Sequence, residues 1–416
     1  MKRILLILML VFLLSSPAMA AETIKIGSLM SLTGALAPFG PPIDNGAKLA
    51  AAQINGAGGI FGRMVEIVTR DTATAAAVAR DAATKLVEID KVSAVVGALA
   101  SSSTVASSSV TIANGVVLIS PASTSPQLTD LKDNDYVFRT CPSDALQGII
   151  QGDVAANQGY KTAAVLFVNN PYGKGLAESF KASFEKRGGK VVAMVSYEGE
   201  KPSYRGEVES AIRLNPDVLN VIAYPVDGNK QLVEAVEIGY EGEYLFPDGM
   251  KGDAVSGGPA KDYIDGSLGT APGPLDVAEA VLFENDYKAF LKQQGLSDKE
   301  ITDAVTVPFR SQAYDAVALI GLAIGNTGQQ FFQMAPKEQG KAIRDNLRRV
   351  AQPPGTHIKY NEFAKAFDLL AKKRAVNYQG VSGPITFDKN GDVTQAAIEI
   401  WLVRKGRTIS VWTVPM

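Results

Sequence analysis

The sequence has very few of the side chains that metal sites and covalent catalysis use. It contains one cysteine, Cys141, and one histidine, His357, in 416 residues. A disulfide within the chain is therefore impossible, and a zinc site built from Cys and His is nearly excluded. Catalysis that depends on histidine would have to use His357, which follows Pro353-Pro354-Gly355 in a sequence typical of a loop. We therefore expect no metal and no cofactor.

Excess charge of one sign is also missing. Lys and Arg number 41, Asp and Glu 43, and the formal net charge is −2. A nucleic-acid-binding protein normally carries a basic face, so we expect no nucleic-acid partner. Hydrophobic residues make up 46% and charged residues 20% of the chain, a balance typical of globular proteins. At roughly 100–200 residues per domain, the length predicts two or three domains.

Long hydrophobic runs are absent apart from one short run at the start. Met1-Lys2-Arg3 is basic, residues 4–14 are apolar, and Ala18-Met19-Ala20 has the small-x-small pattern of a cleavage site. This pattern predicts a secretory signal peptide over residues 1–20, cleaved after Ala20, and hence a periplasmic protein. As a helix the apolar run spans about 16 Å, which is too short for a bilayer core of about 30 Å. An uncleaved N-terminal anchor is the alternative.

After this segment, strand patterns alternate with helix patterns. In the first half we expect strands at Thr23–Met30, Met64–Thr69, Val92–Gly97 and Val116–Ser120, and helices at Asp44–Ile54, Thr74–Ile89 (with Thr74 as the N-cap) and Thr104–Ala113. After Arg139 we expect strands at Ala163–Val168, Val191–Ser196, Val218–Ala223 and Tyr244–Phe246, and helices at Asp144–Gln158, Gly175–Arg187, Tyr204–Leu214 and Asn229–Ile238. This alternation predicts an α/β protein with two doubly wound parallel sheets.

The sequence from residue 270 onward is mixed. Helices are expected at Ala313–Gly325 and Gln339–Val350, and a final pair of strands at Ile385–Asp388 and Ala396–Arg404 around a turn over 388–392. The turn is predicted by its run of Asp, Lys, Asn, Gly and Asp.

Polar side chains follow several of the predicted strands. In open α/β sheets, ligands bind beyond the carboxyl ends of the strands. In the first run these ends carry the segment Ser101–Thr104 and the loop Pro121–Pro126, which contains Ala122, Ser123 and Thr124. In the second run they carry Tyr172, Tyr224 and Asp248.

The two sets of polar residues are chemically complementary. Hydroxyls and backbone N–H groups at a helix N-terminus suit a carboxylate. Asp248 could pair with an ammonium group, and a tyrosine ring could lie against the ligand. Together they suit a zwitterion such as an amino acid. Taken singly, each feature also fits a structural role, because Ser and Thr are frequent helix N-caps and Pro-Asp-Gly is a common turn.

Sequence motifs of enzymes are missing. The glycine-rich loop 55–62 is not G-x-G-x-x-G, because Phe61 stands at the third glycine position. There is no Walker A motif, no G-x-S-x-G elbow and no H-E-x-x-H. The motifs therefore give no support to a dinucleotide-dependent enzyme, a P-loop enzyme, an α/β-hydrolase or a zinc protease.

Several short motifs, taken in their order along the chain, resemble those of the type I periplasmic solute-binding proteins of ABC importers, in the leucine/isoleucine/valine-binding branch. The resemblance covers essentially the whole chain after residue 20. Its markers are Ile24–Gly27, Leu32–Gly34, Ile54-Asn55 with Gly58–Gly62, Val95–Gly97 with Ser101–Thr104, Ile119–Thr124, Tyr172–Gly175 and Gly383–Asp388.

The resemblance implies two lobes joined by three crossovers that close over a ligand. The N-terminal lobe would hold residues 21–141 and 271–384, and the C-terminal lobe 142–270 and 385–416. Ser101 and Thr124 would bind the α-carboxylate; Thr124 and the Ala122 carbonyl would meet the α-ammonium, with Asp248 as its counter-charge. The other implied site residues are Tyr172 and Tyr224 from the far lobe, Phe39 over the ligand side chain, and Leu99, Ala100 and Phe309 in the apolar pocket.

Two departures from the family pattern concern single residues. Ala100 and the Ala73-Thr74 region stand where some members have a disulfide, which Cys141 alone cannot make. Asp248 is shorter than the Glu of some members and therefore reaches less far toward an ammonium.

The function implied by the resemblance is a monomeric receptor that delivers an amino acid, branched-chain or otherwise apolar, to an inner-membrane ABC permease. One alternative is the same receptor for an aromatic or aliphatic carboxylate or an amide. A second is an exported hydrolase that uses Ser101 or Ser123 with His357. A ligand-sensing ectodomain is a third.

Overall fold

The computed structural model describes residues 23–415 of the 416-residue chain. The predicted signal peptide and its cleavage after Ala20 lie outside the described residues. Among the helices within residues 23–415 we find no candidate membrane span.

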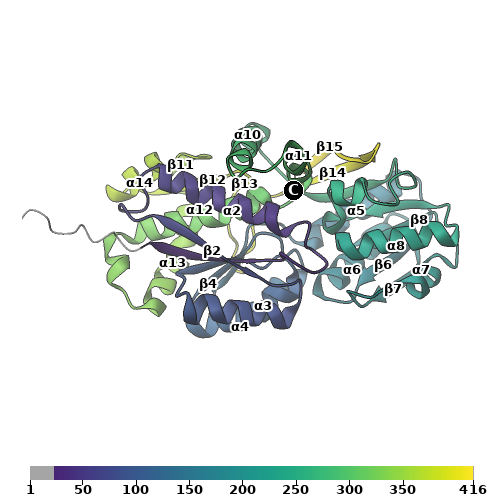
Figure 1. Cartoon of the computed structure of the whole chain (residues 1–416), viewed down its shortest axis with the longest axis horizontal. Coiled ribbons are helices and arrows are strands. Elements are labelled where there is room, and N and C mark those ends of the chain that lie inside the picture. The colour runs from purple at the N-terminus through teal and green to yellow at the C-terminus, as the bar shows by residue number, and fades with distance from the viewer. Residues whose placement is uncertain (1–22, 416) are drawn as a thin grey trace, which may run out of the picture.

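The chain forms two lobes that lie side by side, each built on its own sheet (Figure 1). The sheet of the first lobe is entirely parallel, with strands in the order β2 (Val65–Asp71), β1 (Ile24–Met30), β3 (Ala94–Gly97), β4 (Val117–Ser120) and β5 (Val137–Arg139). Every residue of β3 and β4 is buried, as expected for parallel strands covered on both faces.

Helices cover both faces of the first sheet. One face is packed by α2 (Gly40–Gly56) and α12 (Arg310–Thr327), and the other by α3 (Ala76–Thr84) and α4 (Ser101–Asn114). A π-helical turn over Lys85–Ile89 extends α3. The remaining helices of this half are α10 (Val277–Gln293), α11 (Asp298–Thr306), α13 (Pro336–Ala351) and α14 (Phe363–Ala371).

The second lobe contains a seven-stranded sheet. Its order is β15 (Arg407–Pro415), β14 (Ala397–Arg404), β10 (Leu268–Gly273), β9 (Glu243–Phe246), β8 (Val218–Ile222), β6 (Thr162–Val168) and β7 (Lys190–Tyr197). Strands β6 to β10 run parallel to one another, whereas β14 is antiparallel to β10 and β15 is antiparallel to β14. The helices are α5 (Asp144–Asn157) and α6 (Pro171–Lys186), which pack on each other, α7 (Arg205–Ile212) with α8 (Pro225–Ile238), and the short α9 (Asp253–Ser256).

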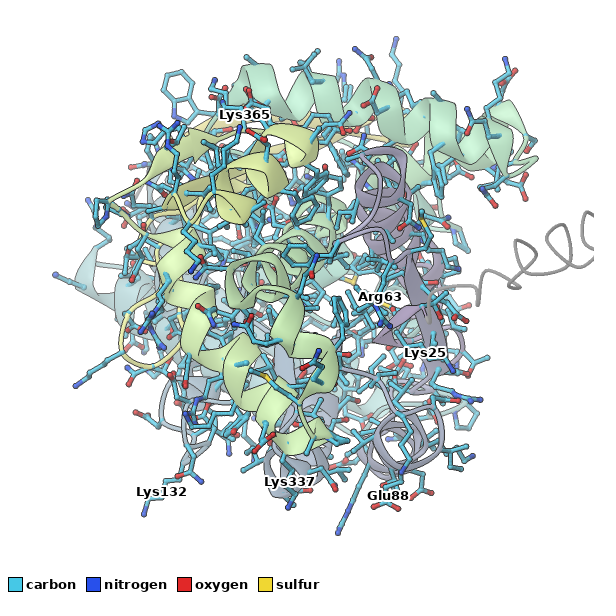
Figure 2. The ribbon with its side chains drawn as sticks, turned by 90° about the vertical axis from the view of Figure 1, so that its left-hand side faces the viewer. Lys25, Arg63, Glu88, Lys132, Lys337 and Lys365 are labelled. Carbon is cyan, nitrogen blue, oxygen red and sulfur yellow. The ribbon has the colours of Figure 1, made fainter. Side chains whose placement is uncertain are left out.

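A small third sheet lies at the end of the first lobe that is remote from the second. It consists of β11 (Thr356–Ile358), β12 (Val376–Gly380) and β13 (Gly383–Pro384). Figure 2 views the molecule from this end, with Lys25, Arg63, Lys132, Lys337 and Lys365 among the side chains at its surface.

The chain passes between the lobes three times, and two of the passages come later than predicted. The first follows β5, and the second follows β10 at Gly273 rather than residue 270. Residues 386–394 still belong with the first lobe, because Phe387 packs on Phe138 and Asp392 pairs with Arg139. The third passage therefore lies just before β14 rather than at 384.

Three local predictions differ from the structure. Residues 385–388 form an isolated bridge between Phe387 and Val393 instead of a strand, and the strand that pairs with β14 is β15, after a turn at Lys405-Gly406. Both turn residues have positive φ, as a two-residue hairpin turn requires. The N-cap of α3 is Ala75 and not Thr74. The Thr74 hydroxyl instead accepts a hydrogen bond from Leu36 N at 3.1 Å and so holds the loop before α2.

Two helices of the second lobe, α6 and α8, start four residues earlier than predicted, for a common reason. Asn170 caps α6 by accepting from Gly173 N at 3.0 Å, and Pro171 fills the first turn. Pro225 does the same in α8. Proline is favoured at this position because its missing N–H has no helical partner to lose. Tyr172 and Tyr224 therefore sit at helix N-termini, which fixes them at the sheet edge that faces the first lobe.

Candidate functional site

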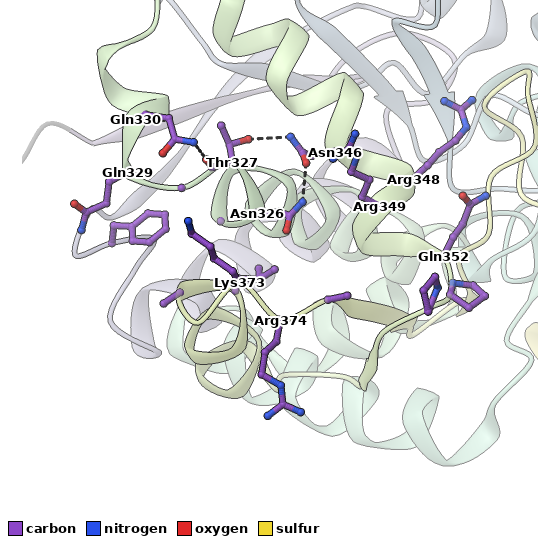
Figure 3. Close-up of a pocket in the computed structure, with 18 residues that line it drawn as sticks. Asn326, Thr327, Gln329, Gln330, Asn346, Arg348, Arg349, Gln352, Lys373 and Arg374 are labelled. Carbon is purple, nitrogen blue, oxygen red and sulfur yellow. Dashed lines mark hydrogen bonds between the residues drawn. The ribbon is translucent and has the colours of Figure 1, made fainter.

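Two hollows differ strongly in size and in lining. The larger, about 960 Å³, lies at the remote end of the first lobe, between α13, α14 and the end of α12 (Figure 3). The smaller, about 20 Å³, lies between the lobes and is lined by eight of the eleven side chains predicted for the site. These eight are Phe39, Leu99, Ser101, Ala122, Tyr172, Tyr224, Asp248 and Phe309.

The first lobe contributes a helix N-terminus to the interlobe cavity. Ser101 is the first residue of α4, and its side chain is buried. The N–H groups of the first helical turn have no partner within the helix and carry the positive end of its dipole. The Ser101 hydroxyl accepts from Ser125 N at 3.3 Å and thereby joins the two polar loops. This corner of the cavity suits a carboxylate.

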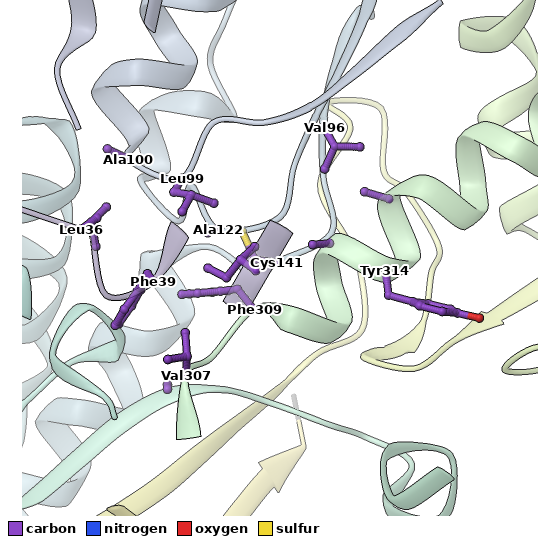
Figure 4. Packing of buried hydrophobic residues seen from close by; sticks show 14 of the residues in the cluster. Leu36, Phe39, Val96, Leu99, Ala100, Ala122, Cys141, Val307, Phe309 and Tyr314 are labelled. Carbon is purple, nitrogen blue, oxygen red and sulfur yellow. The ribbon is translucent and has the colours of Figure 1, made fainter. Parts of the chain in front are cut away.

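Apolar side chains form the opposite part of the lining. Figure 4 shows Phe39, Leu99 and Phe309 packed with Leu36 and Ala122. Each of the five is at least 91% buried. Phe309 has a φ of 69°, a conformation that bulky residues avoid and that costs of order 1–3 kcal/mol. The side chains packed around Phe309 hold it in this conformation. Phe309 is the N-cap of α12, and its ring lines the cavity.

The second lobe contributes two tyrosines and a carboxylate. Tyr172 and Tyr224 are stacked, with ring centroids 5.5 Å apart and planes inclined by 12°. The Tyr172 hydroxyl donates to Asp248 Oδ1 at 2.9 Å, and Gln147 Nε2 donates to the same oxygen at 2.9 Å. Asp248 is 97% buried. It has no cationic partner among the described residues.

A second buried carboxylate lies behind the first. Burial raises the pKa of Asp248 to about 6, although hydrogen bonds from Tyr172 and Gln147 oppose the shift. Burial, and then the charge of Asp248, hold the pKa of Asp144 well above its ordinary value. Asp144 Oδ1 and Gln147 Oε1 are buried and without a hydrogen-bond partner among the described residues. A cation with N–H donors would relieve both the charge repulsion and the unpaired acceptors.

Three of the predicted site residues do not line the cavity. Ala100 is the N-cap of α4 and is buried behind the lining. The Ser123 hydroxyl is turned away, 2.7 Å from Thr104 Oγ1 and 3.2 Å from the carbonyl oxygens of Ala98 and Leu99. Thr124 Oγ1 donates to Asp144 Oδ2 at 2.9 Å. These hydroxyls hold the loops in place, because buried polar groups without partners are costly.

Sequence reasoning missed three residues that organise the site. Arg139, Asp144 and Gln147 lie in or after β5 and are all at least 99% buried. Arg139 Nη1 donates to the carbonyl oxygens of Ser123, Thr124 and Ser125 at 3.3, 3.1 and 2.9 Å. Nothing in the local sequence distinguishes these residues, because Ser143-Asp144 reads as an ordinary helix start.

The lobes touch directly around the cavity. Ser125 Oγ donates to Pro171 O at 2.9 Å, and Val226 N donates to Ala35 O at 3.3 Å. A Cβ atom added to Gly175 would lie 2.6 Å from Pro126 Cδ. The free space of about 20 Å³ suffices for about one water molecule. Access of anything larger to these side chains therefore requires the lobes to move apart.

The groups of a serine hydrolase are not assembled. His357 lies on β11, which packs against β12 and α14, and no residue of the interlobe cavity comes from these elements. Its side chain is exposed. A triad that joins His357 to Ser101 or Ser123 therefore has no geometric support.

The comparisons with known proteins agree with this arrangement. A family model described as periplasmic binding protein matches residues 23–404. The Leu/Ile/Val-binding protein BraC3 of Rhizobium johnstonii is 36% identical over 412 residues, 96% of this chain and 97% of that protein. The chemotactic signal transduction system substrate-binding protein BasB of Halobacterium salinarum is 27% identical over 375 residues, 88% and 84% of the two chains.

Solved structures share the architecture. The branched-chain amino acid transporter substrate-binding protein LivJ of Streptococcus pneumoniae, in complex with isoleucine, superposes with a TM-score of 0.74 at 26% identity and covers 95% of this chain and 100% of its own. An ABC transporter solute-binding protein of R. palustris in complex with benzoate gives 0.73 at 19% identity over 94% and 96%, a likeness of fold alone. From the family model and the full-length relative together, we conclude that this chain belongs to the periplasmic binding protein family.

Proposed function

We propose that the protein captures an α-amino acid with an apolar side chain between its lobes and presents it, as a monomer in the periplasm, to an ABC permease of the inner membrane. It performs no chemistry on the ligand. One observation carries the proposal: a helix N-terminus, which suits a carboxylate, and a buried aspartate without a cationic partner among residues 23–415 face one cavity from opposite lobes. The similarity to a Leu/Ile/Val-binding protein supports the same ligand class.

In this proposal each lobe binds one end of the zwitterion. Ser101 and the first turn of α4 take the α-carboxylate. Asp248, held by Tyr172 and Gln147, takes the α-ammonium. Ala122 lines the same cavity, and Thr124 acts indirectly through its hydrogen bond to Asp144. Phe39, Leu99 and Phe309 surround the side chain. Because the two charges are bound by different lobes, ligand favours the closed arrangement.

A carboxylate receptor is the second candidate. Asp144 and Asp248 repel each other, and one of them can be neutral without any ammonium ligand. In that state the site would accept a ligand that carries only a carboxylate. This candidate predicts that Asp248 is dispensable for binding.

The two candidates separate in a thermal-shift experiment on unfolded and refolded protein, which has lost any ligand carried through purification. L-leucine and 4-methylpentanoate differ only in the ammonium group. At 100 times its dissociation constant, a ligand stabilises the protein by about 2.7 kcal/mol. We expect a large shift with leucine and a much smaller one with 4-methylpentanoate, which binds only through its carboxylate and its apolar chain. A shift with 4-methylpentanoate alone would favour the carboxylate receptor over the amino-acid receptor. The absence of a shift with either compound would exclude both as ligands.

Closure can be tested at Gly175, where α6 meets the loop of the first lobe. Gly175→Val introduces atoms that collide with Pro126 only when the lobes are closed. Overpacking of this kind costs about 1–3 kcal/mol, so we expect leucine affinity to fall roughly 5-fold to 150-fold. Small-angle scattering with saturating leucine should show a larger radius of gyration than the wild type.

The matched control is Gly206→Val in the first turn of α7. A Cβ atom at Gly206 meets nothing within 4 Å. Its affinity for leucine should equal that of the wild type. Equal affinity in Gly175→Val would show that closure does not bring α6 against Pro126.

A further inference from the structure

All the charged side chains that line the hollow at the remote end of the first lobe are basic. Its four charged residues are Arg348, Arg349, Lys373 and Arg374, and no Asp or Glu takes part in the lining. Arg348 and Arg349 come from the last turn of α13, and Lys373 and Arg374 follow the end of α14. Cations thus approach the hollow from two separate elements.

Most of this charge is not compensated within the described residues. Arg348 pairs with Asp135 at 2.7 Å. Arg349, Lys373 and Arg374 make no ion pair or side-chain hydrogen bond there. On the adjoining helices, Asp345 pairs with Lys341 and Arg344, and Asp368 pairs with Lys372. Glu338 accepts a hydrogen bond from Ala335 N at the start of α13 and does not line the hollow. A positive potential therefore remains inside a concave surface, where it is focused.

Amide and hydroxyl side chains line the hollow between the basic residues of α13 and those that follow α14. Asn326 Nδ2 donates to Asn346 Oδ1 at 2.6 Å, and Asn346 Nδ2 donates to Thr327 Oγ1 at 3.2 Å. In Figure 3, Lys373 extends from its turn toward the end of α12, and Arg349 stands beside Asn346. The chain thus presents an ammonium and a guanidinium above a polar floor, with room for a molecule of several heavy atoms.

Basic residues near helix C-termini also interact favourably with the helix dipole, and this explains their sign at the ends of α13 and α14. It does not explain why two such ends face one concavity of about 960 Å³ without a carboxylate between them. A monocarboxylate would neutralise only one of the three unpaired cations. A multivalent oxyanion can accept from Arg and Lys at the same time.

We propose that this hollow is a second binding site, separate from the interlobe cavity, for a phosphate-bearing multivalent anion held by Arg349 and Lys373. A soluble phosphate compound and an anionic lipid headgroup share this chemistry. The site is rigidly part of the first lobe, so its occupation does not require lobe closure.

The probe for the soluble source is sodium pyrophosphate, titrated by calorimetry in a phosphate-free buffer. We expect saturable binding near one equivalent, weakened about 10-fold to 100-fold in Arg349→Gln/Lys373→Gln because two charge-assisted interactions are lost. The control Lys132→Gln/Lys186→Gln removes the same charge from exposed positions outside the hollow. It should bind pyrophosphate like the wild type. Unchanged melting temperatures establish that both variants fold.

The probe for the lipid source is flotation with vesicles that contain cardiolipin, whose headgroup carries two phosphates, compared with phosphatidylcholine vesicles. Binding to the anionic vesicles that requires Arg349 and Lys373 supports a headgroup as the phosphate source. Absence of binding to both probes overturns the proposal. So does an equal loss in the two double variants, because that would be non-specific charge attraction. Neither readout involves leucine, so failure here leaves the proposed function untouched.

Discussion

Asp248→Asn should abolish the response to leucine while it preserves folding. The substitution keeps the shape and one acceptor of the side chain but removes the only charge proposed to face the ligand ammonium. Loss of one partner of a buried charged pair costs about 2–5 kcal/mol, which is roughly 30-fold or more in affinity. Calorimetric titration with leucine and with 4-methylpentanoate measures the effect.

The des-amino ligand makes this result specific. Affinity for 4-methylpentanoate should be unchanged or higher in Asp248→Asn, since its carboxylate no longer approaches a buried anion. Asp248→Glu is the matched control, because it keeps the charge and lengthens the side chain; it should still bind leucine. Equal loss of both ligands in Asp248→Asn would mean that the substitution damages the cavity and does not remove an ammonium partner.

The pH dependence of leucine binding supplies a second measurement of the same group. Burial raises the pKa of Asp248 to about 6, and the unfolded value is near 3.8. In the absence of ligand, its contribution to stability is present below about pH 4 and is lost as the pH rises through about 6. An ammonium ligand favours the ionised form, so binding releases a proton at low pH. We expect leucine affinity to fall by at most about tenfold per pH unit below pH 6, and the profile of Asp248→Asn to lose this dependence on residue 248.

The parts of the fold that follow from local pattern could be predicted from the sequence. Buried strands such as β3 and β4 and their alternation with helices predicted the first sheet and the parallel part of the second, but not the antiparallel pairing of β14 and β15. Polar residues after the strands indicated the sheet edge where the cavity lies. The directions of the hydroxyl groups could not be predicted. Ser123 and Thr124 are neighbours in the sequence, yet the Ser123 hydroxyl contacts Thr104 and the Thr124 hydroxyl contacts Asp144. The β14–β15 hairpin was missed since Lys405-Gly406 is a weaker turn signal than Asp388–Asp392.

The ion pair between Arg139 and Asp392, which holds residues 123–125 of the site in place, was the hardest feature to predict from the sequence. Arg139 and Asp392 are 253 positions apart. Asp392 lies in the turn that carries the chain back toward the second lobe, and that turn reads as a surface feature. Only the folded first lobe brings the two together behind residues 123–125. A buried arginine in such a place predicts a large effect on stability.

Arg139→Ala should lower the free energy of unfolding by about 3–5 kcal/mol. The guanidinium is 99% buried; it binds Asp392 at 2.6 and 2.8 Å and also donates to three carbonyl oxygens and to Thr129 Oγ1. Its removal leaves a carboxylate and several backbone acceptors without partners in a dry interior. Chemical denaturation followed by circular dichroism measures the change.

Arg187→Ala is the matched control for Arg139→Ala. Arg187 also pairs with an aspartate at 2.6 Å, but its side chain is 54% exposed. Exposed pairs contribute about 0–1 kcal/mol, so this variant should be close to the wild type. The residue types and the shortest distance are the same in the two pairs, so the difference between the variants measures burial together with the additional hydrogen bonds of Arg139. Arg139→Ala should also weaken leucine and 4-methylpentanoate alike, since residues 123–125 lose their anchor, whereas Asp248→Asn separates the two ligands. A stability loss no larger than that of Arg187→Ala would show that the loop holds its conformation without Arg139.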